Sequence, residues 1–319
     1  MKTLEELENF YKTNLLPELL ELEERRKKLL KKYFVIALGP ICIVAVGIFI
    51  LTKYLNLISE IIFFVLAPCV IATVVICIFI TRGYVRDFKI LVIDQIVRFI
   101  DENLTYYQSR FIPRSVFVAS QIFKTKPNRY KGDDYVNGKI GDTQIQFSEI
   151  DAKYESGSGK NRSVKTVFKG LFFIADFNKN FKGQTIVLPD AAEKLFGHFG
   201  KLLQSWNLVR DQLISLEDPE FEKLFVVYGS DQVEARYILS TSLMKRIIDF
   251  REKTNRNIYL SFVGSKVFVA VPYTRNLFEP RIFKTVVDFE PIKEYYEDLL
   301  LAVGIVDDLN LNTRIWSKN

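Results

Sequence analysis

The sequence predicts an α+β fold: an N-terminal amphipathic helix and a two-helix transmembrane hairpin, followed by a cytoplasmic mixed α+β region. Three observations lead to this fold class. Two uncharged apolar runs of 18 and 20 residues lie near the N-terminus, at 34–51 and 61–80. Each is long enough for a helix to cross a hydrocarbon layer of roughly 30 Å. A helical apolar stripe precedes these runs, and strand-like segments separated by glycine turns follow them.

Residues 1–33 are predicted to form an amphipathic cytoplasmic helical arm. Leucines recur there at spacings of three, four and seven, which is the pattern of an apolar stripe on a helix. Pro17 interrupts the stripe and is predicted to begin a second helix, because proline is tolerated in a first helical turn. We expect the stripe to pack on a partner helix or on the C-terminal part of this chain. Contact with lipid is the second alternative.

Residues 34–80 are predicted to form the transmembrane hairpin. Positive residues are retained on the cytoplasmic side of a membrane, and here they crowd both ends of the hairpin but not its outer turn. Both termini are therefore expected in the cytoplasm. Pro40 and Pro68, one near the middle of each span, are expected to bend the helices because proline removes a backbone donor. The residues that set the orientation are Arg25, Arg26, Lys27, Lys28, Lys31, Lys32, Arg82 and Arg86.

Residues 81–205 are predicted to form a helical stalk and a first α+β subdomain, and residues 206–319 a second one with a C-terminal helix. A helix should leave the second span and end near Asn103, and a short one should begin at Pro113. Most strands are apolar on both faces, so helices should cover them. Strands are expected at 135–136, 140, 145–147, 166–175, 185–188, 212–216, 224–228, 258–263 and 266–273. Further helices are expected at 191–204, 233–239, 243–253 and 290–303.

Composition excludes several kinds of site. All three cysteines lie within the predicted spans, and the chain has one histidine, His198. The C-terminal part therefore lacks the ligands of disulfides, cysteine-bound zinc, iron–sulfur clusters and histidine-pair metal sites. We assign no catalytic, cofactor-binding or metal-binding residue. The net charge of +6 comes without a clustered basic stripe, so nucleic acid is not an expected partner.

The densest polar cluster follows a predicted strand. Within it, Asp231 and Glu234 have the three-residue spacing of a helix cap and its reciprocal carboxylate, which favours a structural role. The alternative is an acid/base or Mg²⁺-binding pair, which would make the chain a cytoplasm-facing hydrolase or phosphotransferase. The full candidate cluster is Tyr228, Asp231, Glu234, Arg236 and Tyr237.

Two segments carry a resemblance to a known family: FKGLFFIADFNKNFKGQTIV at 168–187 and VYGSDQVEARYIL at 227–239. Over most of residues 1–305 the chain resembles a bacterial family catalogued as domain of unknown function 3137. The resemblance implies two N-terminal spans in the inner membrane and a cytoplasmic α+β region, and it supplies no catalytic residue. It also implies a partner, because genes of this family often lie beside genes for LemA-type helical membrane proteins.

These observations favour a non-enzymatic, membrane-anchored scaffold or assembly subunit with a cytoplasmic interaction domain. Its expected partners are the lipid bilayer and either further copies of the chain or another membrane protein. The runner-up is the hydrolase or phosphotransferase described above. A third class is a subunit of a pore or transport complex, although the spans lack the charged residues that a path for charged cargo normally shows.

Overall fold

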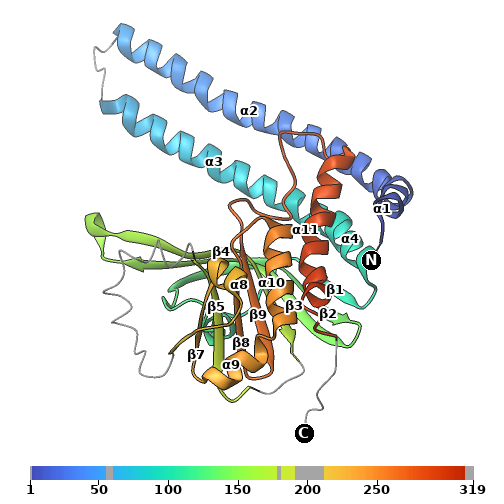
Figure 1. The fold of residues 1–319 in the computed structure, drawn as a ribbon. Coiled ribbons are helices and arrows are strands. Elements are labelled where there is room, and N and C mark those ends of the chain that lie inside the picture. The colour runs from blue at the N-terminus through green and yellow to red at the C-terminus, as the bar shows by residue number, and fades with distance from the viewer. Residues whose placement is uncertain (1, 55–59, 178–180, 191–211, 313–319) are drawn as a thin grey trace. The chain divides into compact units, whose positions relative to one another are not determined.

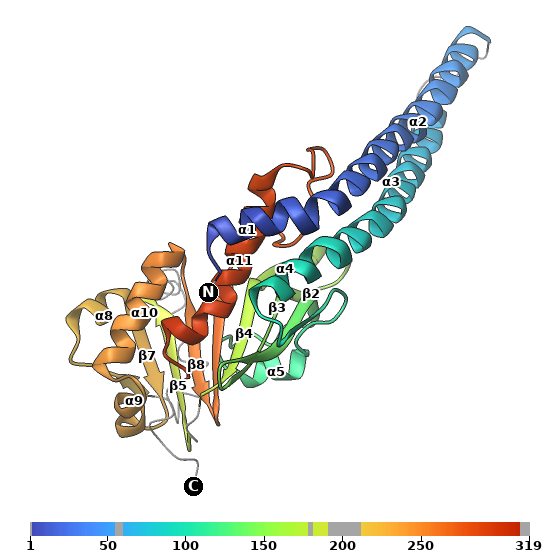
Figure 2. The same ribbon diagram turned by 90° about the vertical axis from the view of Figure 1, so that its right-hand side faces the viewer.

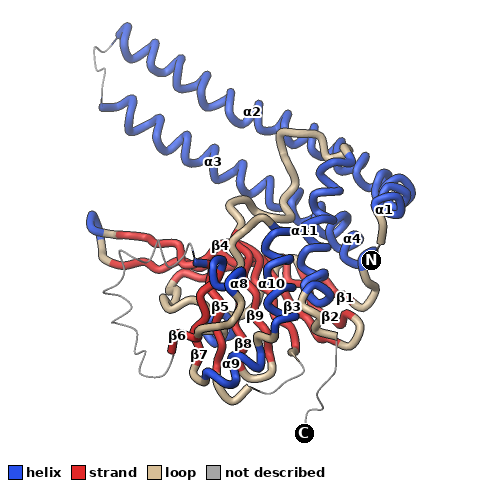
Figure 3. Tube along the Cα trace, viewed as in Figure 1, coloured by secondary structure: helices blue, strands red, loops and turns tan. Residues whose placement is uncertain are grey.

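The computed structural model of the chain describes residues 2–54, 60–177, 181–190 and 212–312. Contacts divide it into two units, the first comprising residues 1–96 and 278–294 and the second comprising 97–277 and 295–319. Long helices dominate the first unit, whereas a β-sheet forms the centre of the second (Figure 1, Figure 3). The helix expected at 191–204, which contains His198, lies outside the described residues.

The first unit begins with three helical segments in succession: α1 (Leu4–Phe10), a π-helical turn η1 (Tyr11–Leu15) and α2 (Leu16–Tyr54). A capping box starts α1, because Thr3 Oγ1 accepts the Glu6 N–H at 3.2 Å and the Glu6 carboxylate accepts the Thr3 N–H at 2.7 Å. Pro17 lies in the first turn of α2, as expected.

Most of the leucine stripe of the arm is buried, although Leu4 at its start is 52% exposed. Leu7, Leu15 and Leu19 have no exposed surface. The ring of Tyr11 meets that of Phe289, at the start of α11 (Phe289–Asp308), with 5.2 Å between ring centroids. The stripe therefore packs on the C-terminal part of the same chain, which is one of the two contacts expected first.

Helix α3 (Glu60–Phe88) runs back alongside α2 (Figures 1 and 2). Arg25 Nη1 donates to Asp87 Oδ2 at 3.0 Å across the pair. The two helices contain both apolar runs, and Pro40 and Pro68 lie inside them; the bends expected there stay predictions. Within the described residues, which leave out most side chains between 37 and 70, no helix is both long enough and apolar enough to cross a membrane.

The second unit contains a nine-stranded sheet of order β1-β2-β3-β4-β9-β8-β5-β7-β6, and its described pairings are antiparallel. Both α+β stretches, 81–205 and 206–319, contribute strands to it, so they share one sheet. The strands are β1 (Leu104–Tyr107), β2 (Arg129–Ile140), β3 (Thr143–Ser156), β4 (Ser163–Asp176), β5 (Gln184–Pro189), β6 (Gln212–Ile214), β7 (Phe225–Gly229), β8 (Tyr259–Val263) and β9 (Lys266–Pro272).

Helices cover the two faces of this sheet (Figure 2). On one face, Phe117 of α5 (Arg114–Ala119) meets Phe172 of β4, with ring centroids 5.0 Å apart. Phe268 and Ala270 of β9 belong to the core on this same face. Alternate residues of a strand point to opposite faces, so Val269 and Val271 of β9 point to the other face, where they are fully buried. The remaining helices of this unit are α8 (Pro219–Leu224), α9 (Gln232–Ile238) and α10 (Thr241–Thr254). Burial on both faces confirms the expectation of a helix-covered sheet.

Several element boundaries differ from those expected. The helix that was expected to leave the second span consists of the end of α3, the π-helical turn η2 (Lys89–Ile93) and α4 (Asp94–Ile100). Strand β1 starts close to where that helix was expected to end. Helix α8 was not predicted, although Asp218 caps it by accepting the N–H groups of Glu220 and Phe221. Helix α11 continues to Asp308 instead of ending at Val303.

Candidate functional site

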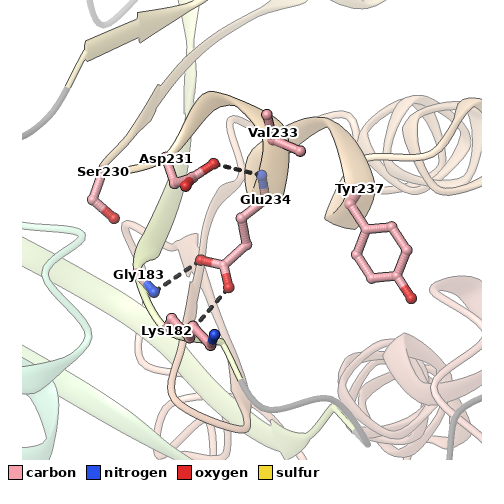
Figure 4. Close-up of a pocket in the computed structure, with 7 residues that line it drawn as sticks. All are labelled: Lys182, Gly183, Ser230, Asp231, Val233, Glu234 and Tyr237. Atoms are coloured by element: carbon pink, nitrogen blue, oxygen red, sulfur yellow. Dashed lines mark hydrogen bonds between the residues drawn. The ribbon is translucent and has the colours of Figure 1, made fainter.

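A pocket of about 500 Å³ opens beside α9 in the second unit (Figure 4). It forms where the start of β5 meets the end of β7, because Thr185 and Gly229 are paired in register in these two strands. The lining residues come from the turn before β5, from the β7–α9 corner and from α9 itself. They are Lys182, Gly183, Ser230, Asp231, Val233, Glu234 and Tyr237.

Asp231 is the N-cap of α9. Its Oδ1 accepts the Glu234 N–H at 2.8 Å, which satisfies a backbone donor at the helix start. This is the hydrogen bond that the three-residue spacing indicates.

The Glu234 carboxylate bonds to a distant part of the chain. Its Oε1 accepts the Lys182 N–H and its Oε2 accepts the Gly183 N–H, both at 2.8 Å (Figure 4). These residues lie 52 and 51 positions earlier in the sequence. Where a reciprocal cap was expected, the side chain therefore links α9 to the turn before β5.

Gly183 allows this close approach. A Cβ atom at this position would lie 2.1 Å from Ser230 Oγ and 2.9 Å from Glu234 Oε2. Ser230 Oγ also accepts the Gln184 N–H at 2.9 Å. Side chains of the β7–α9 corner thus accept three successive backbone N–H groups of residues 182–184, and a Cβ atom at the middle one would displace two of these acceptors.

The structure brings three of the five predicted cluster residues together in this pocket: Asp231, Glu234 and Tyr237. Arg236 instead donates from Nε and Nη2 to the Ser215 carbonyl at 3.3 and 3.2 Å. Tyr228 lies within β7, in register with Ile186 of β5. Neither is among the residues that line the pocket.

The geometry of the two carboxylates favours a structural role over acid/base chemistry. A general acid or base must exchange a proton with a bound substrate, and a metal ligand must offer a lone pair to the ion. Asp231 and Glu234 instead accept three backbone N–H groups between them. Asp231 caps α9, and Glu234 joins α9 to the turn before β5.

A second acidic group lies at a β-bulge of β2. One carboxylate oxygen from each of Asp133, Asp134 and Glu149 lies within 4.8 Å of the others, a spacing that could hold Mg²⁺ or Ca²⁺. Protein donors already reach two of them: the Tyr106 hydroxyl donates to Asp134, and the Leu277 N–H donates to Glu149 Oε2 at 2.8 Å. Because the buried members serve as acceptors for the fold, we do not assign a metal site. Asp133 and Glu149 are in register across β2 and β3, a pairing that brings the group together and that a single sequence does not reveal.

Comparison with known proteins gives a family and one distant structural likeness. Residues 166–311 match the model of a family described as "Protein of unknown function (DUF3137)". No curated protein matches the chain. The crystal structure of the mycobacterial trehalose monomycolate transport factor A, TtfA, has a TM-score of 0.33 and 10% sequence identity, covering 65% of this chain and 94% of that one. A likeness of this size carries no argument about function.

Proposed function

Residues 166–311 belong to the DUF3137 family of proteins of unknown function, and we propose that this chain is a membrane-anchored scaffold or assembly subunit without enzymatic activity. In this proposal, a helical hairpin over residues 34–80 spans a bacterial inner membrane and both termini face the cytoplasm. The sheet unit then offers a cytoplasmic surface to a second copy or to another membrane protein. The family resemblance suggests a LemA-type partner.

One observation carries the membrane part of the proposal: apolar side chains of α3 are exposed one after another. Ile71 is 62% exposed and Phe79 is 68% exposed. Val74, Val75, Ile76 and Ile78 are each about half exposed. Contiguous apolar surface of this kind is unfavourable in water and marks contact with lipid or protein. Lipid tails would cover it along the whole uncharged run from Ile61 to Ile80.

Charges at the ends of the hairpin support the same proposal. Lys27, Lys28, Lys31 and Lys32 on α2 are exposed, as are Arg82 and Arg86 on α3. The Arg82 guanidinium lies over the Phe79 ring, 5.3 Å from its centroid, as a cation beside an aromatic does at a membrane interface. Arg26, which we counted among the orientation residues, is buried in an ion pair with Glu23 and does not contribute to this exposed set.

The scaffold part of the proposal is supported by the candidate pocket. The Asp231 carboxylate caps α9 and the Glu234 carboxylate joins α9 to the turn before β5, and both are structural tasks. Anchoring would raise the local concentration of the sheet unit, so that modest contacts suffice for assembly.

The proposal is tested by fractionation of the full-length protein followed by cross-linking in native membranes. We expect the chain to sediment with membranes until detergent is added, and to cross-link to a second copy or to another membrane protein. Val75→Asp should move it toward the supernatant, because a charge within a span costs about 3 kcal/mol. Val233→Asp, at a position that is 79% exposed in the other unit, is the matched control and should have no effect.

Two results would contradict the proposal. One is a full-length protein that stays in the supernatant after high-speed centrifugation without detergent. The other is a membrane-bound protein that remains monomeric and forms no cross-link with any other protein.

A further inference from the structure

Residues 278–288 belong to the loop that joins β9 to α11, and they are attached to α2 within the first unit (Figure 2). The Val286 N–H donates to Glu23 Oε2 at 3.2 Å, and Arg26 Nη1 donates to the Ile282 carbonyl at 3.0 Å. Going back along the loop from 286 to 282, the contacts thus advance along α2 from residue 23 to residue 26. The loop therefore rises toward Phe34, where the proposed span begins.

The start of this loop segment contacts η2, the turn that follows α3. Glu279 Oε1 lies 3.0 Å from Lys89 Nζ, and Lys89 comes nine positions after Ile80, the end of the second proposed span. Both ends of this loop segment are thus held on the cytoplasmic ends of the proposed hairpin. The apex of the loop, residues 281–284, lies between Glu279 and Val286, the outermost of these contacts.

The apex is a tight turn with an aromatic residue at its tip. The Lys284 N–H donates to the Arg281 carbonyl at 3.0 Å, which places Ile282 and Phe283 at the corners of a β-turn. Phe283 is 82% exposed, more than any other large apolar side chain described. Exposed cationic residues, Arg281 and Lys284, flank it.

The attachment below the turn is rigid. Arg26 donates to both carboxylate oxygens of Glu23, from Nε at 2.9 Å and from Nη2 at 2.7 Å, and each side chain is only 10% exposed. A bidentate pair of this kind fixes orientation as well as position. The buried Arg26–Glu23 ion pair therefore fixes the position of the turn that exposes Phe283.

We propose that the turn at residues 281–284 inserts into the headgroup layer of an anionic membrane, with the Phe283 ring at the apolar boundary. The inference rests on the proposed function, because it needs the hairpin to be in that membrane. Arg26 lies eight positions before Phe34, or about 12 Å along the helix. A headgroup layer roughly 5–7 Å thick would begin about 5–7 Å beyond Arg26, which is the distance that the turn has to bridge to enter it.

Charge selects lipid over protein as the occupant. Arg281 pairs with Glu294, whereas Lys284 and the lysines of α2 are exposed. Cations near a membrane surface are attracted to anionic headgroups. An aromatic ring between cations is the combination found in segments that lie at the membrane interface.

Depth-dependent fluorescence quenching in the full-length protein tests the proposal. Cys42, Cys69 and Cys77 are replaced by alanine, and Phe283→Cys then carries an environment-sensitive dye in phosphatidylglycerol-containing liposomes with brominated acyl chains. Two probes at other positions serve as controls: native Cys77 retained as the only cysteine, and Val233→Cys, a site of similar exposure in the other unit. We expect several-fold stronger quenching at 283 than at 233, and strong quenching at 77.

The outcomes separate this inference from the proposed function. Quenching at 77 combined with a signal at 283 equal to that at 233 would overturn the insertion and leave the hairpin standing. No quenching at 77 would overturn the hairpin itself. A probe at 283 that is shielded from aqueous iodide but not reached by brominated lipid would show that protein covers the turn, which also overturns the proposal.

Lipid composition tests the charge argument. With phosphatidylcholine alone, or with Lys284→Gln in anionic liposomes, quenching at 283 should fall while quenching at 77 stays the same. Equal quenching at 283 in neutral and anionic lipid would refute the selection of anionic headgroups.

Discussion

Replacement of Gly183 by alanine should loosen the corner at which β5, β7 and α9 meet. The new Cβ would lie 2.1 Å from Ser230 Oγ and 2.9 Å from Glu234 Oε2, closer than non-bonded atoms approach, so both acceptors would have to move. Ser230 would then lose the Gln184 N–H, and Glu234 would lose the Gly183 N–H.

The expected cost follows from these two hydrogen bonds. Each contributes about 1 kcal/mol net, and because both lie near the surface, water can replace the lost acceptors. Alanine also restricts the unfolded chain, which returns about 0.4–1 kcal/mol. We expect the free energy of unfolding to fall by about 1–2 kcal/mol.

A double-mutant cycle, measured by urea unfolding with circular dichroism, tests this origin of the cost. Ser230→Ala alone should cost about 1 kcal/mol because it removes one acceptor. In the double variant the new Cβ would meet Ser230 Cβ at 3.4 Å, an ordinary contact, so the combined loss should be smaller than the sum by about 1 kcal/mol. Gly83→Ala is the control, since nothing lies within 4 Å of its added Cβ and alanine favours the helix.

Additive losses in the cycle would refute the reasoning, because they would show that the new methyl group and the Ser230 hydroxyl do not meet. A Gly183→Ala protein as stable as the parent chain would refute it as well.

Three further predictions concern other parts of the chain. Glu23→Gln should cost about 3 kcal/mol in a urea titration, because Arg26 would stay buried without its carboxylate. The Arg26 hydrogen bonds lower the pKa of Glu23 from 4.5 to about 2, so this stability should be complete above pH 4.5 and lost as the pH falls toward 2, a loss that the variant should not show. Phe117→Ala should cost about 3–5 kcal/mol by the same titration, because the ring packs between the sheet and Phe123; a loss below 1 kcal/mol would contradict this packing. Asp231→Ala should lower stability by about 1 kcal/mol through loss of the cap, whereas loss of a hydrolase activity with unchanged melting would favour the enzyme.

Strands and helices with a clear local period could be predicted from the sequence. The hairpin of β8 and β9 was expected around Gly264, where the structure has a φ of +63° that suits glycine. Strand β1 was not expected, because its four residues are too few to show a period and they directly follow a helical pattern. Pairing between β4 and β9, which unites the two α+β stretches, depends on contacts that no local pattern contains.

Only the part of the candidate site that lies within one helical turn could be predicted from the sequence. The spacing of Asp231 and Glu234 indicated the cap, because both groups belong to one helical turn. The partners of the Glu234 carboxylate lie more than fifty positions earlier, at Lys182 and Gly183. Their proximity follows from the pairing of β5 with β7, which a single sequence does not reveal.

The order of strands in the sheet has a consequence for how the chain is made. Gly170 of β4 is paired with Pro272 of β9, and the two are separated by 272 minus 170, or 102, positions. At about 5–20 residues per second, a ribosome needs roughly 5–20 s to deliver the second strand after the first. Throughout that interval the edge of the nascent β4 that will pair with β9 is exposed, and its phenylalanines are not yet fully buried. We therefore expect the nascent chain to be prone to aggregation until β9 has been synthesised.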